Sequence, residues 1–279
     1  MNFPAGTSSP RSGRPAANGN ASSGKVAVKG SDDAARRILY TGLYHAFLQP
    51  NLFNDCDGAY RGADGKNHED PGHETYTVFS LWDTYRAAHP LYTLLQPERV
   101  PDMVNTMLDI YDEQGYLPVW HLYGSDTREM IGIQSVPVVA DAVMKGFPGI
   151  DYDRAFEAMK RSMLSDYKGL AWLRTQDYIP SDKEGESVAK GLEYALADGS
   201  IALAAESLGC EEDARLFGRR ARFYTSYWDP ETRFFRGRNL DGSFRRTVRS
   251  VPLDPPQRRL LRGYGVAVHL AGAATTSGG

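Results

Sequence analysis

The chain has 279 residues, of which 41% are hydrophobic and 24% charged, and its formal net charge is -3. This is the composition of an ordinary globular protein, and without a run of about 18 apolar residues it predicts no membrane span. Acidic residues outnumber basic ones between residues 31 and 243. We therefore expect no nucleic acid as a partner, because phosphate binding needs clustered Lys and Arg. The two cysteines, Cys56 and Cys210, are too few for a disulfide framework and wrongly spaced for a zinc site.

Residues 1–30 are rich in Gly, Ser, Pro and Ala and have no apolar period, which predicts a disordered tail. Beyond them, apolar residues recur at helical spacing in several segments. The predicted helices cover residues 31–48, 77–89, 100–113, 137–146, 151–165, 187–208 and 211–227. No stretch alternates as a strand does, so we expect an all-α fold. Paired helices with long loops at 50–76 and 115–135 favour a partial toroid of helical hairpins, with a helical solenoid as the alternative.

Residues 54–62, NDCDGAYRG, have the composition of an oxygen-ligand calcium loop or of a turn held by Asx hydrogen bonds. Counted from Asp55, the twelfth position is Lys66 rather than the Glu that an EF-hand requires. The turn is therefore the favoured interpretation.

Residues 76–86 place Trp82, Asp83 and Arg86 at neighbouring positions of a predicted helix. An aromatic plane beside a carboxylate and a guanidinium can stack on a sugar ring and accept its hydroxyl protons. Taken by themselves, however, these residues favour a core tryptophan with a nearby ion pair.

Two further patches, residues 120–132 and 182–198, hold polar and aromatic residues next to predicted helices. His121 in the first patch is interpreted as a structural histidine rather than as a catalytic base. Glu186 and Ser187 in the second stand at a helix start, where capping explains them as well as catalysis does. The sequence contains no nucleophile elbow, P-loop, HExxH or CxxC signature, which excludes several enzyme classes.

Taken together and in order, these patches resemble the catalytic domain of the calcium-dependent α-mannosidases of glycoside hydrolase family 92. The most specific stretches are TVFSLWDTYRA (77–87) and EGESVAK followed by LEYA (184–195). The resemblance covers residues 32–244. Further matching stretches are ILYTGLYHAFLQPNLFNDCDGAYRG, GYLPVWHL, MIGIQSVPVVADAVMKG and YWDPETRFFRGR.

The resemblance implies that residues 31–244 form the first part of an (α/α)6 toroid. It implies inverting, exo-acting hydrolysis of terminal α-mannosides of glycans, with calcium as cofactor. As substrate contacts it implies Trp82 and Asp83 of the SLWD motif, with Arg128 as a weaker candidate. Glu193, like Glu186 and Tyr194, matches the motif with either a structural or a binding role. Calcium ligands are expected outside this chain, and relatives are usually periplasmic or secreted, although the sequence shows no signal peptide.

The sequence also departs from this family. The general acid of the family lies in an EG.AWQ motif and the base in a later GNxD.G segment, and neither motif occurs here. The β-sandwich that the resemblance places before residue 31 is missing as well. We therefore expect this chain to be inactive as given, with no catalytic residue to assign. Gln134 stands where an Asn-His or Tyr-His pair is frequent in the family.

Residues 245–279 hold six Arg and no Lys, and we interpret them as a non-native tail. One choice of codons for Leu253–Val268, read one nucleotide further on, encodes SIHRNDDYCEGTAWQ, which contains the missing acid motif. We hypothesise a frameshift, which the sequence of the gene would test.

Two other functions stay open. One is a different (α/α)6 glycosidase, trehalase-like or α-glucosidase-like, and the other is a non-catalytic helical carbohydrate-binding module. An incomplete toroid also predicts that apolar side chains on its inner stripes are exposed. These side chains are Leu81, Val104, Val139, Leu192 and Ile201.

Overall fold

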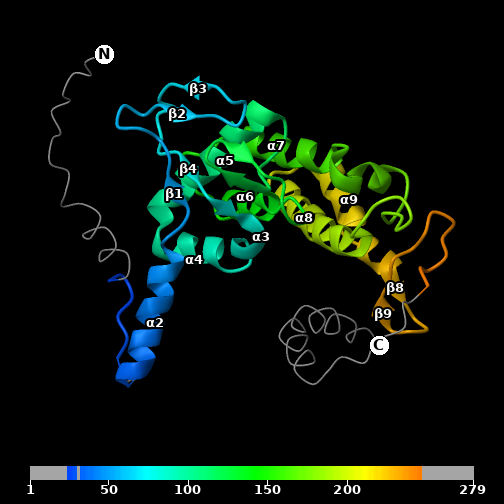
Figure 1. The fold of residues 1–279 in the computed structure, drawn as a ribbon. Helices are drawn as coiled ribbons and strands as arrows, with labels where there is room; N and C mark the ends of the chain where they lie inside the picture. Colours follow the sequence, from blue (N-terminus) through cyan, green and yellow to red (C-terminus); the bar gives the residue numbers. More distant parts are fainter. Residues whose placement is uncertain (1–23, 30–31, 247–279) are drawn as a thin grey trace, which may run out of the picture. The chain divides into compact units, whose positions relative to one another are not determined.

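The computed structural model describes residues 24–29 and 32–246, and helices make up most of their regular structure (Figure 1). The α-helices are α2 (Asp33–Ala46), α3 (Leu81–Thr84), α4 (Ala88–Leu95), α5 (Val100–Gln114), α6 (Ser135–Met144), α7 (Tyr152–Leu164), α8 (Ser187–Ser207) and α9 (Glu211–Arg220). The 3-10 helices are η1 (Pro97–Arg99), η2 (Tyr167–Arg174) and η3 (Phe223–Tyr227). The chain divides into a unit of Met1–Ser243 and a short unit of Phe244–Gly279.

Small antiparallel sheets connect the helices, which corrects the expectation of a fold without strands. Strand β1 (Asn51–Leu52) pairs with β4 (Tyr76–Thr77), and β2 (Tyr60–Arg61) pairs with β3 (Asn67–His68). Strands β5 (Phe79–Ser80), β6 (Trp120–Leu122) and β7 (Ser125–Asp126) form one sheet, and β8 (Trp228–Asp229) pairs with β9 (Phe234–Phe235). Strands this short cannot show the alternation by which a sequence indicates a strand.

Two predicted helices differ from the structure, while the others match it closely. In place of one helix over 77–89, the chain runs through β4 and β5 before α3 begins at Leu81. Val78, between these strands, has a left-handed φ of 62°, so the backbone turns from the sheet with β1 to the sheet with β6. The predicted helix 211–227 ends at Arg220, and a 3-10 turn follows it.

The sequence predicted that five apolar side chains on the inner stripes are exposed, and this prediction is wrong for most of them. Leu81, Val104, Val139 and Ile201 are buried, and only Leu192 is half-buried. They are covered because α5, α6, α7 and α8 pack on one another and share one hydrophobic core. The described part of the chain therefore buries these stripes by itself.

Helix α8 is the centre of this packing, since it contacts α6, α7 and α9 and runs side by side with α9 in Figure 1. Its residue Gly191 faces the ring of Tyr227, which is fully buried. The Tyr227 hydroxyl accepts a hydrogen bond of 2.7 Å from the Ile179 backbone N–H. A glycine at this position thus lets the 3-10 helix η3 approach α8.

We expect Gly191→Ala to lower the free energy of unfolding by about 1–3 kcal/mol, because overpacking a core costs that much. Helix propensity alone would favour alanine by about 1 kcal/mol, but the new methyl group would lie 2.2 Å from the Tyr227 hydroxyl oxygen. The control is Gly199→Ala on the same helix, where the nearest atom, Ala221 Cβ, is 3.6 Å away. Thermal denaturation of both variants measures the difference, and equal behaviour of the two would contradict the steric argument.

The predicted tails fall mostly outside the described residues. Of residues 1–30, only 24–29 are described, and Val26 accepts a hydrogen bond of 2.8 Å from the Tyr40 hydroxyl. Of residues 245–279, including the segment with the proposed frameshift, only 245 and 246 are described. Within the described ranges, no helix combines the length and the apolar character that crossing a membrane requires.

Candidate functional site

The SLWD segment contacts α8, and the contact is centred on the carboxylate of Glu193. Trp82 Nε1 and Arg86 Nη2 each donate a hydrogen bond of 3.2 Å to Oε1 of this carboxylate. The Tyr85 hydroxyl donates to Oε2 at 3.1 Å, and Gln134 Nε2 donates to the same oxygen at 2.7 Å. Four donors from two parts of the chain, the SLWD segment and the loop before α6, therefore converge on one side chain of α8. We call Trp82, Tyr85, Arg86, Gln134 and Glu193 the Glu193 cluster.

Arg86 also stacks on the aromatic members of the Glu193 cluster. Its Cζ lies 5.3 Å from the centroid of the Trp82 ring and 4.8 Å from that of Tyr85. Its Nε donates to the Trp82 backbone oxygen at 3.4 Å. Trp82 is half-buried and Arg86 is exposed, so part of the aromatic residue and the cation are accessible to solvent.

The phenol of Tyr85 stays protonated at neutral pH. Burial and the neighbouring Glu193 carboxylate raise the pKa of Tyr85 to about 12. The hydroxyl is therefore a stable donor to Glu193 across the physiological range.

The loop before α6 brings Gln134 into the cluster. Gly132 has a left-handed φ of 84°, and a Cβ there would lie 2.2 Å from Gln134 Nε2 and 3.1 Å from Glu193 Cβ. Glycine therefore allows the loop to pass close enough for the amide to reach the carboxylate. Gln134 itself is buried.

Asp83 lies next to Trp82 and differs from Glu193 in its surroundings. Its side chain is exposed. No described residue forms a hydrogen bond or an ion pair with it. Glu193 is thus saturated by protein donors, whereas the Asp83 carboxylate is available to a ligand.

The structure places Arg128 in a separate group of aromatic residues. Its Nε donates to the Tyr116 hydroxyl at 2.6 Å, and its Cζ lies 5.1 Å from the Tyr116 ring centroid. Tyr116 stacks on Tyr167 at 5.6 Å between centroids. Among the described residues, no hydrogen bond, ion pair or ring contact joins the Arg128 side chain to Trp82 or Asp83.

Helix α8 connects the two groups through adjacent residues. Glu193 belongs to the cluster described above, while the Tyr194 hydroxyl donates to the Lys168 backbone oxygen at 3.2 Å. Lys168 Nζ in turn donates to the Arg128 backbone oxygen. Arg128 is therefore positioned by the same helix as Trp82, through different contacts.

Capping does not explain Glu186. This residue stands at the N-cap of α8 in a left-handed conformation, and its side chain makes no capping hydrogen bond. It is exposed. The capping interpretation is therefore wrong for this side chain.

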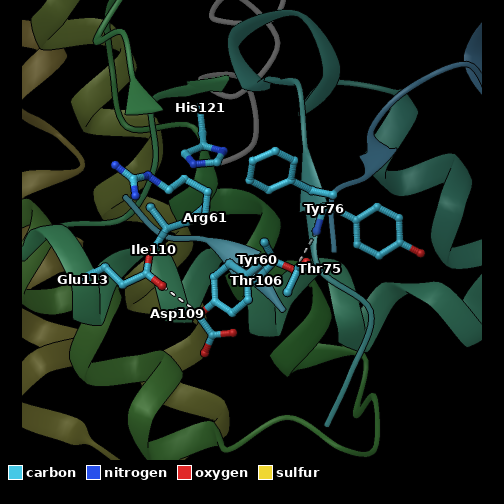
Figure 2. A pocket seen from close by; sticks show the side chains of 10 residues that line it. Tyr60, Arg61, Thr75, Tyr76, Thr106, Asp109, Ile110, Glu113 and His121 are labelled. Carbon is cyan, nitrogen blue, oxygen red and sulfur yellow. Dashed lines mark hydrogen bonds between the residues drawn. The ribbon is translucent and has the colours of Figure 1, made fainter. Parts of the chain in front are cut away.

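Apart from the Glu193 cluster, His121 and several other polar side chains line a pocket (Figure 2). Its polar groups are largely paired with one another, since the Tyr60 hydroxyl donates to Glu113 at 2.7 Å and the Tyr76 backbone N–H donates to Thr106 at 3.2 Å. His121 Nδ1 is buried without a hydrogen-bond partner among the described residues. Burial lowers the pKa of His121 to about 4. The ring is therefore neutral at pH 7, as in a structural histidine.

No described residues form a metal site. Within 24–29 and 32–246, no group of three or more His, Cys, Asp and Glu is arranged to hold a metal ion. Residues 54–62 contain a turn in which the Asp57 side chain accepts from the Ala59 N–H at 3.1 Å and Gly58 has a φ of 91°. This geometry matches the interpretation as an Asx turn.

Sequence reasoning singled out Trp82 and Arg86 of the Glu193 cluster, named Gln134 only as a departure from the family pattern, and gave no role to Tyr85. Tyr85 lies in the same motif, and its polar ring beside Trp82 was the available signal. The resemblance drew attention to the position of Gln134, but its hydrogen bond to Glu193 on α8 could not be read from the local sequence.

The model of the glycosyl hydrolase family 92 catalytic domain matches residues 19–263. The structure is similar to that of the family GH92 α-mannosidase BT3965 from Bacteroides thetaiotaomicron, with a TM-score of 0.80 and 44% identity over 86% of this chain and 32% of that one. The complex of BT3965 with mannoimidazole superposes with a TM-score of 0.81. The family GH92 inverting mannosidase BT2199 from the same species has a TM-score of 0.78 and 32% identity, over 85% of this chain and 34% of its own.

A curated relative, an uncharacterised secreted glycosidase from Arthroderma benhamiae, is 25% identical over 172 residues, which are 56% of this chain and 22% of the relative. The chain thus spans about a third or less of the length of these proteins.

Proposed function

Since the chain belongs to glycosyl hydrolase family 92, we propose that it supplies part of the mannose-binding site of an exo-acting α-mannosidase. The observation that carries this proposal is the pairing of Trp82 with Asp83. Glu193 holds the indole by its N–H, and the adjacent Asp83 carboxylate is exposed. An aromatic face next to a carboxylate suits the apolar face and the hydroxyl groups of a pyranose.

In this proposal each residue has one task. The Trp82 ring stacks on the sugar, the Asp83 carboxylate accepts hydrogen bonds from its hydroxyl groups, and Arg86 donates at the edge of the site. Arg128 lies in the neighbouring aromatic group and would contact a more distant part of the glycan. The complex of BT3965 with mannoimidazole supports a mannose-like ligand for the chain.

We further propose that these residues belong to an (α/α)6 toroid with an inverting mechanism, for which the similarity to BT2199 is the support. Inversion needs two carboxyl groups about 6.5–9.5 Å apart, one as acid and one as base. The family's motifs for both groups are absent from this sequence. We therefore propose that the chain binds a mannoside without hydrolysing it.

Calcium does not fit the described residues, because they offer no suitable group of ligands. No binding or catalytic step on these residues is therefore assigned to the ion. If calcium acts in the complete enzyme, we propose that its ligands lie outside residues 24–29 and 32–246.

The test is a calorimetric titration of the chain with mannoimidazole, together with an assay of aryl α-mannoside hydrolysis in calcium and in chelator. We expect binding without turnover. Failure to bind would overturn the sugar site, and turnover that the chelator abolishes would overturn the proposed inactivity. Methyl α-glucoside serves as the comparison ligand. If the chain binds it more tightly than methyl α-mannoside, a trehalase-like or α-glucosidase-like protein is favoured.

A further inference from the structure

We infer that Glu193 is the positioning residue of the sugar site, and that it sets the orientation of Trp82 and Arg86 without touching the sugar itself. This inference rests on the proposed function for the identity of the ligand. The geometry of the carboxylate carries it.

The first step is that both oxygens of Glu193 are fully used. Oε1 accepts from Trp82 and Arg86, and Oε2 accepts from Tyr85 and Gln134. A carboxylate has about four acceptor positions, so no position is left for a sugar hydroxyl. Only 14% of the side chain is exposed, which leaves a sugar little access to it.

Apart from their hydrogen bonds to Glu193, Arg86 and Trp82 are held mainly by the stacking of Arg86 on Trp82 and Tyr85. Arg86 is exposed, and its other polar contact in the described part of the chain is with the backbone of Trp82. The Trp82 indole N–H has Glu193 as its hydrogen-bond partner. Removing the charge of Glu193 would therefore release both side chains at once.

Mobility of Trp82 and Arg86 in the free protein would lower the affinity for a ligand. A binding site gains affinity when its side chains are held in the bound orientation before the ligand arrives. Charge-assisted hydrogen bonds are about twice as strong as neutral ones, so a charged Glu193 holds the indole better than an amide would. Glu193 thus affects affinity through Trp82 and Arg86.

The experiment compares the full chain with Glu193→Gln and with the control Glu206→Gln. Glu206 is exposed on the same helix, so the control removes the same charge outside the cluster. The first readout is the indole 1H–15N resonance of Trp82, assigned by its loss in Trp82→Phe. The second is the dissociation constant of mannoimidazole.

We expect Glu193→Gln to move the Trp82 resonance, to leave those of Trp120, Trp172 and Trp228 in place, and to weaken mannoimidazole binding about tenfold. Glu206→Gln should change neither readout. An unmoved Trp82 resonance, or unchanged affinity in a chain that binds mannoimidazole, would overturn the inference. A general loss of stability would instead move all four resonances.

If Glu193→Gln does not fold, Tyr85→Phe takes its place, because it removes one donor and keeps the ring under Arg86. It should also move the Trp82 resonance, and an unmoved resonance in this folded variant would overturn the inference. If the unaltered chain fails to bind mannoimidazole, the proposed function fails, while the resonance still decides whether Glu193 holds Trp82.

Discussion

We expect Arg220→Ala to lower the free energy of unfolding by about 3–5 kcal/mol, the cost of leaving one partner of a buried ion pair alone. Arg220 and Asp198 are both buried. Arg220 Nε donates to Asp198 Oδ2 at 3.0 Å, and Nη2 donates to the Met163 backbone oxygen at 2.9 Å. One guanidinium therefore links α9 to both α8 and α7. No substitution on the exposed surface should cost as much.

Thermal denaturation measures this effect, and for a chain of this size the melting temperature should fall by about 6–20 °C. The matched control is Arg219→Ala, the neighbouring arginine on α9, which is exposed and should change stability by less than about 0.5 kcal/mol. Equal losses in the two variants would contradict the importance of the pair. Asp198→Asn together with Arg220→Met should recover part of the loss, since this change removes both charges.

The same loss should depend on pH. Burial raises the pKa of Asp198 to about 7, against the opposing effect of Arg220. Because the folded state binds this proton more tightly than the unfolded state, stability falls as the pH rises from about 4 through the folded-state pKa. Without Arg220 the pKa rises further. The cost of Arg220→Ala should therefore be larger at pH 8 than at pH 5.

Helices with a clear apolar period were predictable from the sequence. The predicted segments 100–113, 151–165 and 187–208 correspond to α5, α7 and α8. Their information is local, because the apolar residues recur every three or four positions and Gly or Pro stands near the ends. Such helices can be predicted without knowing which elements they pack against.

Residues 76–80 were not predictable in the same way, because partners distant in the sequence decide their conformation. Strand β4 pairs with β1 and strand β5 pairs with β6. Val78 takes a left-handed φ between them, which a β-branched residue rarely adopts. The segment is therefore extended despite its helical pattern of apolar residues.

In the candidate site, too, some residues are recognisable from the local sequence, whereas others depend on partners distant in the sequence. Trp82 and Asp83 stand out locally, because an aromatic residue beside an acid is visible in a short motif. The role of Glu193 depends on Trp82, 111 positions away, and on Gln134 in a third segment. A glutamate on a helix has many roles, so only the fold could indicate this one.

Asp83 itself is exposed beside Trp82. In a chain that binds mannoimidazole, Asp83→Asn should weaken binding by about 10- to 100-fold, because hydrogen bonds to a charged group contribute about 1.5–3 kcal/mol. Stability should stay unchanged, because the side chain is exposed and has no partner among the described residues. This combination separates Asp83 from Glu193, whose loss would disturb the packing of Trp82 as well.

Calorimetric titration of Asp83→Asn with mannoimidazole measures the affinity, and thermal denaturation checks the fold. The control is Asp153→Asn, which removes an exposed aspartate from the first turn of α7 and should leave the affinity as it was. A change below about threefold, which is less than about 0.7 kcal/mol, would make Asp83 a surface residue with no part in binding. Because the indole of Trp82 stays in place in this variant, any larger loss must come from the carboxylate rather than from a rearranged aromatic plane.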